Sequence, residues 1–382
     1  MTAFQTVPSL LIEFGAARRL GEILRGQYGQ THVCLVTDAF LNRSGLLKPA
    51  LASLAAADWT VTVIDDVVAD PPEPVVLAAA QRARDCGAEI VLGLGGGSSM
   101  DVAKLIAVLA ASDQPLQEMY GIGNVRGPRL PLVQVPTTAG TGSEVTPISI
   151  VTTGETTKMG VVSPRLYADQ AILDAELTLG LSPAATAMTG IDAMVHAIEA
   201  YTTRHLKNPL SDMLACKALD LLGRNLLAAC RNGADRPARE AMLLGATLAG
   251  QAFANAPVAA VHALAYPIGG IFHVPHGLSN SLVLPQVLRF NAQAASQHYS
   301  ELADIIVPGS AGSAEARTDA LVRHMEGLIG QCGIPRRLAE VGIREQDLDR
   351  LAADAMKQVR LLGNNPRDLT ERDARAIYAS AL

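Results

Sequence analysis

The feature that most constrains the fold is an alternation of short β-type runs with helical runs in the first third of the chain. The β-type runs are rich in Val, Ile, Leu and Thr, and each is followed by a run with helical periodicity. We expect strands at 32–37, 60–65 and 89–94, and helices at 40–56, 73–86 and 98–110. Apolar strands that alternate with helices are typical of a parallel sheet covered on both faces. Further short strands are expected at 132–136, 148–152 and 159–162, and an antiparallel extension of the sheet is one arrangement for them.

The pattern changes near residue 180, where Ser182 is suited to cap a helix and Pro183 to occupy its first position. Beyond this point the chain is rich in Ala and Leu, and strand signals nearly vanish. We expect helices at 184–201, 209–230, 238–254, 314–331, 345–357 and 371–381. The sequence therefore predicts an α/β domain over 1–180 and an all-helical domain over 181–382. A cleft between two such domains is a common place for a ligand.

Composition excludes several classes of function. The 382 residues carry a net charge of −6, and aromatic residues make up 4% of the chain, so nothing predicts binding to nucleic acid or to an anionic membrane. The segment 241–272 has no charged residue, but Pro257, Pro267 and Gly269–Gly270 interrupt it, which favours buried helices over a membrane span. Five cysteines without CxxC spacing, and no signal peptide pattern at the start, favour a reducing cytoplasm.

A glycine-rich turn follows the third predicted strand and opens a helix, in the sequence GGGSSMD over Gly95–Asp101. Such a turn lets the backbone approach a ligand, and the N–H groups of the first helical turn then face an anion such as a pyrophosphate. The GxGxxG pattern is absent, because Ser98 stands where the third glycine would be. The alternative is a tight strand-to-helix turn without a ligand. The candidate binding residues here are Gly96, Gly97, Ser98, Ser99 and Asp101.

Two further features point to a nucleotide. Asp38 follows the first predicted strand, where a carboxylate can accept hydrogen bonds from a ribose diol and repel a 2′-phosphate, so it favours NAD over NADP. The alternative is that Asp38 caps the next helix. The loop 136–146, PTTAGTGSEVT, is dense in hydroxyl groups and can contact ribose and phosphate, line an active site, or be a surface loop. Its candidate residues are Thr137, Thr138, Thr141, Ser143 and Thr146.

Histidines cluster in the second half of the chain, where five of the eight lie between residues 196 and 276. Asp192 and His196 are four positions apart in a predicted helix, so they share one face. His262 lies in a helical run over 258–266, and His273 and His276 follow the Gly269–Gly270 pair, which we interpret as a break. One carboxylate and up to three imidazoles can therefore meet around one ion. This donor set suits iron or zinc.

Four motifs resemble the iron-containing (group III) alcohol dehydrogenase family. They are GGGSSMDVAK at 95–104, PTTAGTGSEVT at 136–146, GIDAMVHAIEAY at 190–201 and HALAYPIGGIFHVPHG at 262–277, in the family's order along the whole chain. The resemblance implies a Rossmann-like NAD-binding domain and a helical domain for metal and substrate. It also implies an Fe(II) or Zn ion held by Asp192, His196, His262 and His276, with His273 close to the metal and the nicotinamide.

The resemblance further implies the residues that contact the cofactor. These are Asp38, Asp70, Gly97, Ser98, Thr137, Thr138, Thr146 and Lys158. Family members that prefer NADP commonly have glycine in place of Asp38, so NAD is expected. Asp70 departs from the asparagine that is frequent in the family, which weakens that contact. The implied activity is interconversion of a small primary alcohol or diol and its aldehyde, in a homodimer or larger homo-oligomer.

Three other functions are compatible with parts of the pattern. A glycerol dehydrogenase-like polyol oxidoreductase generally has three metal ligands, whereas four candidates stand here. A dehydroquinate synthase-like lyase needs several Lys and Arg near its metal, and 190–201 and 258–277 contain neither. A protein that binds NAD without catalysis is the third, and lack of turnover with any alcohol would favour it.

Overall fold

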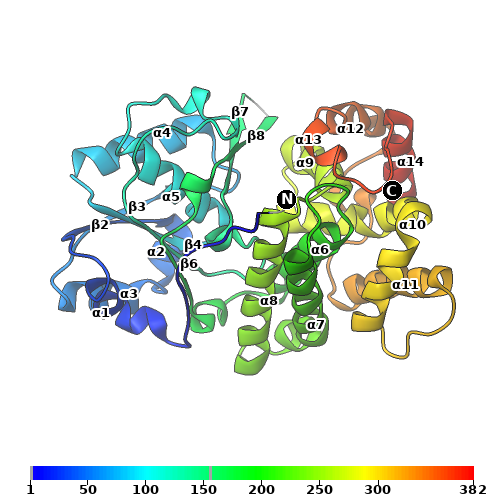
Figure 1. Ribbon diagram of the computed structural model, residues 1–382, viewed down its shortest axis with the longest axis horizontal. Coiled ribbons are helices and arrows are strands. Elements are labelled where there is room, and N and C mark those ends of the chain that lie inside the picture. Colours follow the sequence, from blue (N-terminus) through cyan, green and yellow to red (C-terminus); the bar gives the residue numbers. More distant parts are fainter. Residues whose placement is uncertain (1–2, 155–156) are drawn as a thin grey trace. The chain divides into compact units, whose positions relative to one another are not determined.

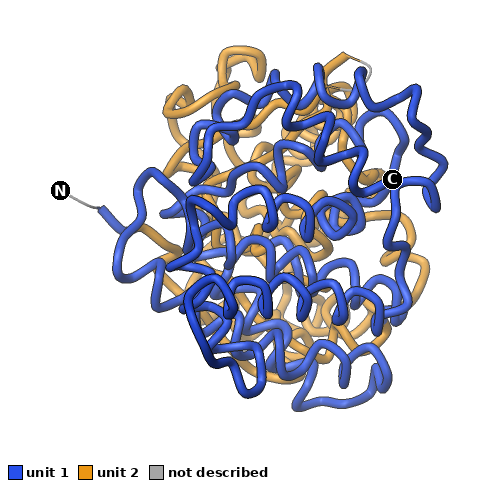
Figure 2. The backbone as a smooth tube through the Cα atoms, turned by 90° about the vertical axis from the view of Figure 1, so that its right-hand side faces the viewer, with its two compact units in different colours: residues 1–4, 139–141, 181–382 blue, residues 5–138, 142–180 orange. Residues whose placement is uncertain are grey.

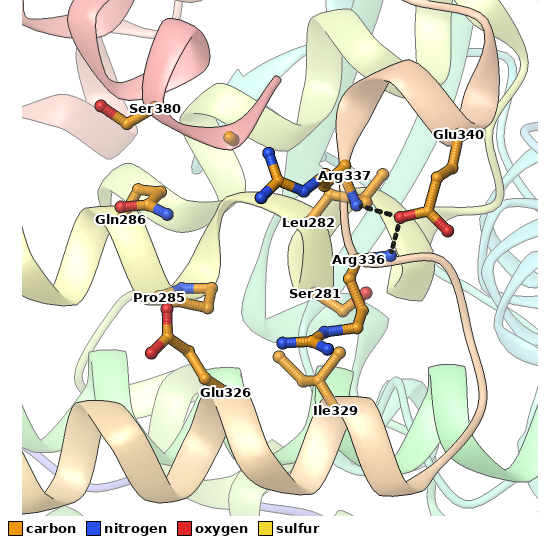
Figure 3. Close-up of a pocket in the computed structure, with 11 residues that line it drawn as sticks. Ser281, Leu282, Pro285, Gln286, Glu326, Ile329, Arg336, Arg337, Glu340 and Ser380 are labelled. Atoms are coloured by element: carbon orange, nitrogen blue, oxygen red, sulfur yellow. Dashed lines mark hydrogen bonds between the residues drawn. The ribbon is translucent and has the colours of Figure 1, made fainter.

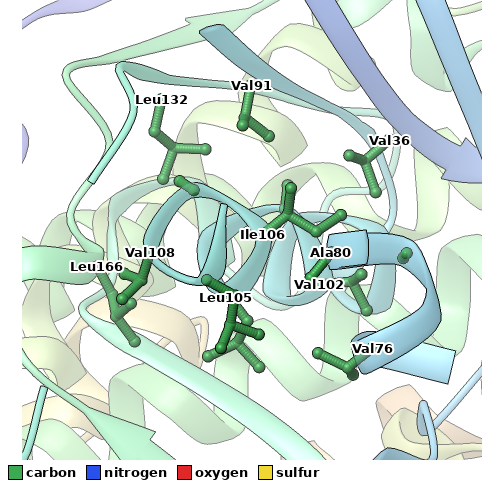
Figure 4. Packing of buried hydrophobic residues seen from close by; sticks show 14 of the residues in the cluster. Val36, Val76, Ala80, Val91, Val102, Leu105, Ile106, Val108, Leu132 and Leu166 are labelled. Carbon is green, nitrogen blue, oxygen red and sulfur yellow. The ribbon is translucent and has the colours of Figure 1, made fainter. Parts of the chain in front are cut away.

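The computed structural model describes residues 3–154 and 157–382, which form two compact units. Of the described residues, 5–138, 142–154 and 157–180 form the sheet unit, which is unit 2 of Figure 2, and 3–4, 139–141 and 181–382 form the helical unit, which is unit 1. A parallel-sheet part and an all-helical part confirm the predicted fold class (Figure 1).

The sheet unit is built on a six-stranded parallel sheet with the strand order β1-β9-β6-β4-β2-β3. Its strands are β1 (Leu10–Ile12), β2 (His32–Asp38), β3 (Thr60–Val67), β4 (Ile90–Gly95), β6 (Leu132–Pro136) and β9 (Gln170–Leu173). The helices of the unit are α1 (Leu20–Arg25), α2 (Ala39–Ser44), α3 (Lys48–Ala56), α4 (Glu73–Asp85) and α5 (Gly97–Leu109). The edge strand β1 and its neighbour β9 have three and four residues and were not predicted.

The sheet has a hydrophobic core on each face because side chains alternate along the strands. In β2, Cys34 and Val36 join the core beneath α4 and α5, whereas Val33 and Leu35 join the core on the side of α1 and α3. Figure 4 shows the first of these cores, with Ile106 of α5 among the buried side chains. The strand sequences are almost continuously apolar because both faces of the sheet are buried, as the sequence predicted.

The predicted strands at 148–152 and 159–162 form a separate sheet. β7 (Ile148–Thr153) and β8 (Thr157–Val162) pair in antiparallel fashion, and the short strand β5 (Gly121–Ile122) adds to β8. The single helix expected at 40–56 is instead two helices, α2 and α3. Gly45 ends α2 with a positive φ of 85°, which breaks the helical backbone.

The helical unit contains α6 (Pro183–Thr202), α7 (Pro209–Arg231), α8 (Arg236–Asn255), α9 (Ala260–Phe272), α10 (His276–Ile306), α11 (Ala314–Gln331), α12 (Leu348–Ala355), α13 (Val359–Leu362) and α14 (Glu371–Ala381). Helices α6, α7 and α8 pack on one another, and α10 packs on α6, α9 and α11. Ser182 caps α6 as predicted, because its Oγ accepts the N–H of Ala185 at 3.1 Å.

Two predictions in the helical unit were wrong. Helix α9 continues through Gly269–Gly270 and ends at Phe272, and the break follows at His273, which has a positive φ of 55°. The 31-residue helix α10, which contains Pro285, was not predicted. His276 is consequently the first residue of a helix and not part of a loop.

All five cysteines are free thiols. None of the helices in the described ranges is long and apolar enough to cross a membrane.

Candidate metal centre and nucleotide-binding edge

Four of the residues predicted to bind a metal come together in the helical unit. The ligand atoms offered by Asp192, His196, His262 and His276 all lie within 4.8 Å of one another. The Oδ1 atom of Asp192 is 3.8 Å from Nε2 of His262 and 3.6 Å from Nε2 of His276. Two atoms bound to one tetrahedral metal at about 2.1 Å would lie about 3.4 Å apart. The cluster is therefore close to the dimensions of a metal site.

Three helices supply these side chains. Asp192 and His196 lie one turn apart on α6, His262 lies on α9, and His276 begins α10. Gly277 lets α10 approach α6, because a Cβ atom there would lie only 2.3 Å from the carbonyl oxygen of Met188. A side chain at residue 277 would push the start of α10, and His276 with it, away from Asp192.

The histidine rings are packed together and mostly buried. The ring of His196 stacks on Phe253 at 4.3 Å and on His262 at 4.8 Å between centroids. Burial lowers the pKa of His196 to about 3, so this imidazole is neutral at pH 7 and its nitrogen can donate to a cation. Burial alone would raise the pKa of Asp192, but the three histidines and the amide of Asn280 outweigh it, and the pKa lies below its usual value.

Glu199 supports the cluster and was not predicted. It is buried, its Oε2 is 2.6 Å from Nδ1 of His262, and its Oε1 accepts the N–H of Val261 at 2.7 Å. A carboxylate only accepts hydrogen bonds, so Nδ1 of His262 carries the proton and Nε2 keeps its lone pair for a metal. Glu199 lies seven residues after Asp192, on the same face of α6, and this spacing is the sequence signal that could have identified it.

Asn280 is the second residue that sequence reasoning missed. Its Nδ2 lies 2.5 Å from Oδ1 of Asp192 and 3.3 Å from Nε2 of both His262 and His276. Its Oδ1 is buried and has no hydrogen-bond partner among the residues that the structure describes. The position four residues after His276 places both side chains on one face of α10, and it is the signal that could have revealed Asn280.

His273 lies outside this cluster. It is exposed in the turn between α9 and α10, where its backbone N–H bonds the carbonyl of Gly269 at 3.0 Å. The structure thus separates His273 from the four clustered residues.

Thr141 lies in the short stretch 139–141 of the helical unit, next to Gly140, which packs directly on Thr189 of α6.

Several of the residues predicted to bind a nucleotide lie at one edge of the parallel sheet. Strands β6, β4 and β2 are neighbours and run in the same direction, so the residues after their carboxyl ends lie side by side. Asp38 ends β2, Gly96–Ser98 follow β4, and Thr137–Thr138 follow β6. The chain passes from β2 to β3 on one side of β2, and after β3 it returns to β4 on the other side. The carboxyl edge between β2 and β4 is therefore the switch point where open α/β sheets bind ligands.

The glycine turn is shaped for a close approach of strand and helix. Gly96 is the residue before α5, which begins at Gly97, and no side chain caps this helix. A Cβ atom at Gly95 would lie 2.7 Å from the side chain of Ser99, which is buried. The first turn of α5 consequently presents its backbone N–H groups, including that of Ser98, to an anion.

Two acidic residues of this edge already have partners. Oδ1 of Asp38 accepts the N–H of Leu41 at 2.9 Å, so Asp38 caps α2, which was the alternative to ribose binding. The cap uses one carboxylate oxygen. Asp70 has a positive φ of 50°, and its Oδ1 is 2.5 Å from Nζ of Lys158 on β8. Asp70 and Lys158, both predicted to contact the cofactor, are thus paired with each other.

The loop after β6 is fixed to α5 by a buried lysine. Nζ of Lys104 donates to Oγ of Ser143 at 2.8 Å, to Oγ1 of Thr146 at 3.2 Å and to the carbonyl of Ile148 at 2.6 Å. Ser143 in turn donates to Oδ1 of Asp101 at 2.5 Å. Burial lowers the pKa of Lys104, against the attraction of Asp101. These contacts hold the loop, and they engage three of the predicted cofactor residues in internal hydrogen bonds.

Comparison with known families decides the classification. The model described as iron-containing alcohol dehydrogenase matches residues 8–175, and the model of the C-terminal part of the Fe-containing alcohol dehydrogenase family matches residues 186–382. The chain belongs to the iron-containing alcohol dehydrogenase family. The resemblance seen in the four motifs is thereby confirmed.

Relatives of this iron-containing alcohol dehydrogenase match along nearly the whole chain. It is 42% identical to long-chain-alcohol dehydrogenase 1 of Geobacillus thermodenitrificans, over 92% of this chain and 90% of that protein. It is 33% identical to the NAD-dependent methanol dehydrogenase of Bacillus methanolicus, with full coverage of both. A crystal structure of 1,3-propanediol oxidoreductase superposes with a TM-score of 0.96 at 33% identity, again over 100% of both chains.

The residues of this iron-containing alcohol dehydrogenase fit the metal that its family name implies. One carboxylate and three imidazoles form a donor set for a divalent transition metal. Three of the four residues are buried, and Nδ1 of His196 has no hydrogen-bond partner in the described part of the chain. Buried polar atoms without partners are unfavourable unless a ligand satisfies them. A bound cation would satisfy this donor set.

Proposed function

We propose that this dehydrogenase interconverts a small primary alcohol or diol and its aldehyde, with NAD as the hydride carrier and iron at the four-residue cluster. The observation that carries the proposal is the convergence of Asp192, His196, His262 and His276 within 4.8 Å. In this proposal residues 1–180 form the NAD-binding domain, and residues 181–382 form the metal-binding and substrate domain.

The ligand side chains have complementary tasks in this proposal. Asp192 supplies one negative charge, and the neutral imidazoles supply nitrogen lone pairs. Glu199 holds His262 in the tautomer with an unprotonated Nε2, and Asn280 fixes one oxygen of Asp192. The metal, when bound, supplies a Lewis acid that lowers the pKa of the alcohol and polarises the aldehyde carbonyl. Iron is favoured by the family's name and by the carboxylate ligand.

NAD is assigned to the carboxyl edge of β2, β4 and β6. The N–H groups of Gly97, Ser98 and Ser99 would bind the pyrophosphate, and Thr137 and Thr138 would contact it from the neighbouring strand. NAD supplies the nicotinamide that accepts or donates the hydride. The remaining predicted contacts divide by their partners: Asp38, Asp70, Gly96 and Lys158 face the nucleotide in this proposal, whereas Asp101, Ser143 and Thr146 hold the loop.

Asp38 also sets the choice of cofactor in this proposal. Its capping bond to Leu41 uses Oδ1, so Oδ2 can accept a hydrogen bond from a ribose hydroxyl. A 2′-phosphate at the same place would meet a negative charge and the NADP complex would be destabilised. The name of the NAD-dependent methanol dehydrogenase, a full-length relative, agrees with this choice.

His273 is proposed to transfer the alcohol proton to solvent. Its side chain is exposed, and it lies three residues before His276 in the turn that leads into α10. An exposed imidazole so close in sequence to a metal ligand can exchange protons with water. We also propose that the enzyme is a cytoplasmic homodimer or larger homo-oligomer. The presence of His196 in the cluster favours this family's four-ligand site over the three-ligand site of a glycerol dehydrogenase-like enzyme.

The proposal is tested by an anaerobic screen of primary alcohols, diols and aldehydes with NAD or NADH, combined with elemental analysis of the purified protein. His262→Ala and His276→Ala should each lose bound metal and NAD-linked turnover. His205→Ala removes an exposed histidine outside the cluster and should keep both. Full activity in either metal-free variant, or no turnover of any alcohol by metal-loaded protein, would overturn the proposal.

A further inference from the structure

A cavity lies in the helical unit, and none of the four clustered residues lines it. Its volume is about 420 Å³, and it is walled by α10, α11, the turn at 336–340 and the end of α14 (Figure 3). Its lining residues are Ser281, Leu282, Pro285, Gln286, Glu326, Ile329, Arg336, Arg337, Glu340, Ser380 and Ala381. This volume is within the range of sites that bind small molecules.

The turn at 336–340 contributes two exposed arginines to the lining of this cavity. Oε1 of Glu340 accepts the backbone N–H groups of Arg336 and Arg337 at 3.0 and 2.9 Å, which fixes the turn. Figure 3 shows both guanidinium groups extending from this turn toward the wall with Gln286 and Glu326. The Arg336 guanidinium rests on Gly330 of α11, where an added Cβ atom would lie 3.5 Å from Cζ.

The acceptor groups of the cavity are engaged, whereas donors remain available. Glu326 pairs with Arg289 at 2.6 Å, and the carbonyl oxygen of Gln286 accepts from the same arginine at 3.3 Å. Within the described ranges, neither guanidinium of Arg336 and Arg337 has a hydrogen bond or an ion pair. The two hydroxyl groups donate to backbone carbonyls, Ser281 to Leu278 and Ser380 to Ala376.

The local charges agree with this inventory. The lining has two arginines, at 336 and 337, and two glutamates, at 326 and 340, and Glu326 is paired with Arg289, which lies outside the lining. Guanidinium groups match the oxygen pairs of carboxylates and phosphates. The amide nitrogen of Gln286 adds a further donor on the opposite wall. An occupant must therefore be rich in acceptors and negatively charged.

We propose that this cavity is a binding site for a small dianion that carries phosphate or carboxylate groups, and that Arg336 and Arg337 are the residues that hold it. None of its lining residues belongs to the proposed metal centre, and the argument for it does not use the dehydrogenase proposal; only the tests rest on that proposal, because they use protein saturated with NAD. Helix α10 contributes to both places. His276 and Asn280 lie on its first turns in the proposed metal centre, and Ser281 and Gln286 line the cavity directly after them.

The test uses chemical protection, which reports on each arginine separately. The metal-loaded protein, saturated with NAD so that the glycine turn is occupied, is treated with phenylglyoxal, and the modified peptides are quantified by mass spectrometry. Inorganic phosphate and malonate, compared with chloride at constant ionic strength, should slow modification of Arg336 and Arg337 at least threefold. Arg323 and Arg350, two exposed arginines outside the cavity, serve as internal controls. The stronger of the two anions identifies the chemistry of the natural ligand.

A second measurement uses variants with the same change in charge. Arg336→Ala/Arg337→Ala should weaken phosphate or malonate binding about tenfold or more in calorimetry of the NAD-saturated protein, because each lost charged hydrogen bond is large on this scale. Arg323→Ala/Arg350→Ala should bind as wild type. Equal protection of all four arginines, or equal anion affinity in the two double variants, would overturn the proposal. Absence of dehydrogenase activity in the alcohol screen would contradict the proposed function and not this anion site.

Discussion

Glu199→Gln is the substitution that most sharply probes how the cluster is organised. The carboxylate of Glu199 accepts two hydrogen bonds in a buried position, from Nδ1 of His262 and from the N–H of Val261. Glutamine has the same shape but only one acceptor oxygen and one donor nitrogen. One of the two donors must therefore face an N–H₂ group. The substitution keeps the volume and changes only the pattern of hydrogen bonds.

The size of the effect follows from this conflict. If the amide N–H₂ faces His262, Nδ1 must become the acceptor and the proton moves to Nε2, the atom that faces Asp192. If it faces Val261, a buried backbone donor loses its partner, at about 1–3 kcal/mol. Changes to groups that orient a metal ligand typically cost about 10–100-fold in metal affinity. We expect a loss in that range, equivalent to about 1.4–2.7 kcal/mol.

The assay is competition between the protein and a chelator for Fe(II) under anaerobic conditions, with Zn(II) as a second ion. The control is Glu301→Gln, because Glu301 also accepts two hydrogen bonds in the helical unit, from Tyr201 and Gln297. Thermal unfolding of the metal-free proteins checks that both variants fold. If Glu199→Gln binds metal within twofold of wild type while Glu301→Gln does the same, the role assigned to Glu199 is wrong.

Three further outcomes are expected. Gly277→Ala should abolish tight metal binding, measured by elemental analysis, because its Cβ would lie 2.3 Å from the Met188 carbonyl; a normal metal content would show that α10 shifts freely. Asp38→Gly should lower the ratio of NAD to NADP specificity, in kcat/KM, at least tenfold, and an unchanged ratio would remove Asp38 from the nucleotide site. Lys104→Met leaves buried acceptors without their donor, so urea unfolding should show a loss of about 3 kcal/mol; a loss below about 1 kcal/mol would contradict the anchoring role.

Local periodicity was sufficient to predict the elements that carry most of the site. The spacing of Asp192 and His196 places both on one face of a helix, and the structure has them on α6. The strand runs at 32–37 and 89–94 predicted β2 and β4, because strands buried on both faces are almost wholly apolar. In each case the signal is local, within one helix or one strand.

What could not be predicted depends on contacts between distant segments. The spacing of Glu199 from Asp192 places both on one face of a helix, but a glutamate in a helix usually faces solvent, and its burial depends on its distant partners Val261 and His262. Asn280 is uninformative until α6 and α9 lie beside α10.

Glycine was a misleading signal in the helical unit. The Gly269–Gly270 pair suggested a break, yet α9 passes through it, because tertiary packing outweighs a penalty of about 1 kcal/mol per glycine. The 31-residue helix α10 was not predicted; it contains Pro285 and packs on α6, α9, α11 and α14. The residue that does end α9 is His273, through a positive φ that its sequence position did not indicate.

The central claim is that one metal ion is held by four side chains from α6, α9 and α10. The most direct measurement is an anomalous difference map, recorded at the iron edge, from crystals of protein loaded anaerobically with Fe(II). We predict one peak per chain, within about 2.0–2.3 Å of a ligand atom from each of Asp192, His196, His262 and His276. A map without density at this cluster, or with the ion bound elsewhere in an active enzyme, would contradict the account.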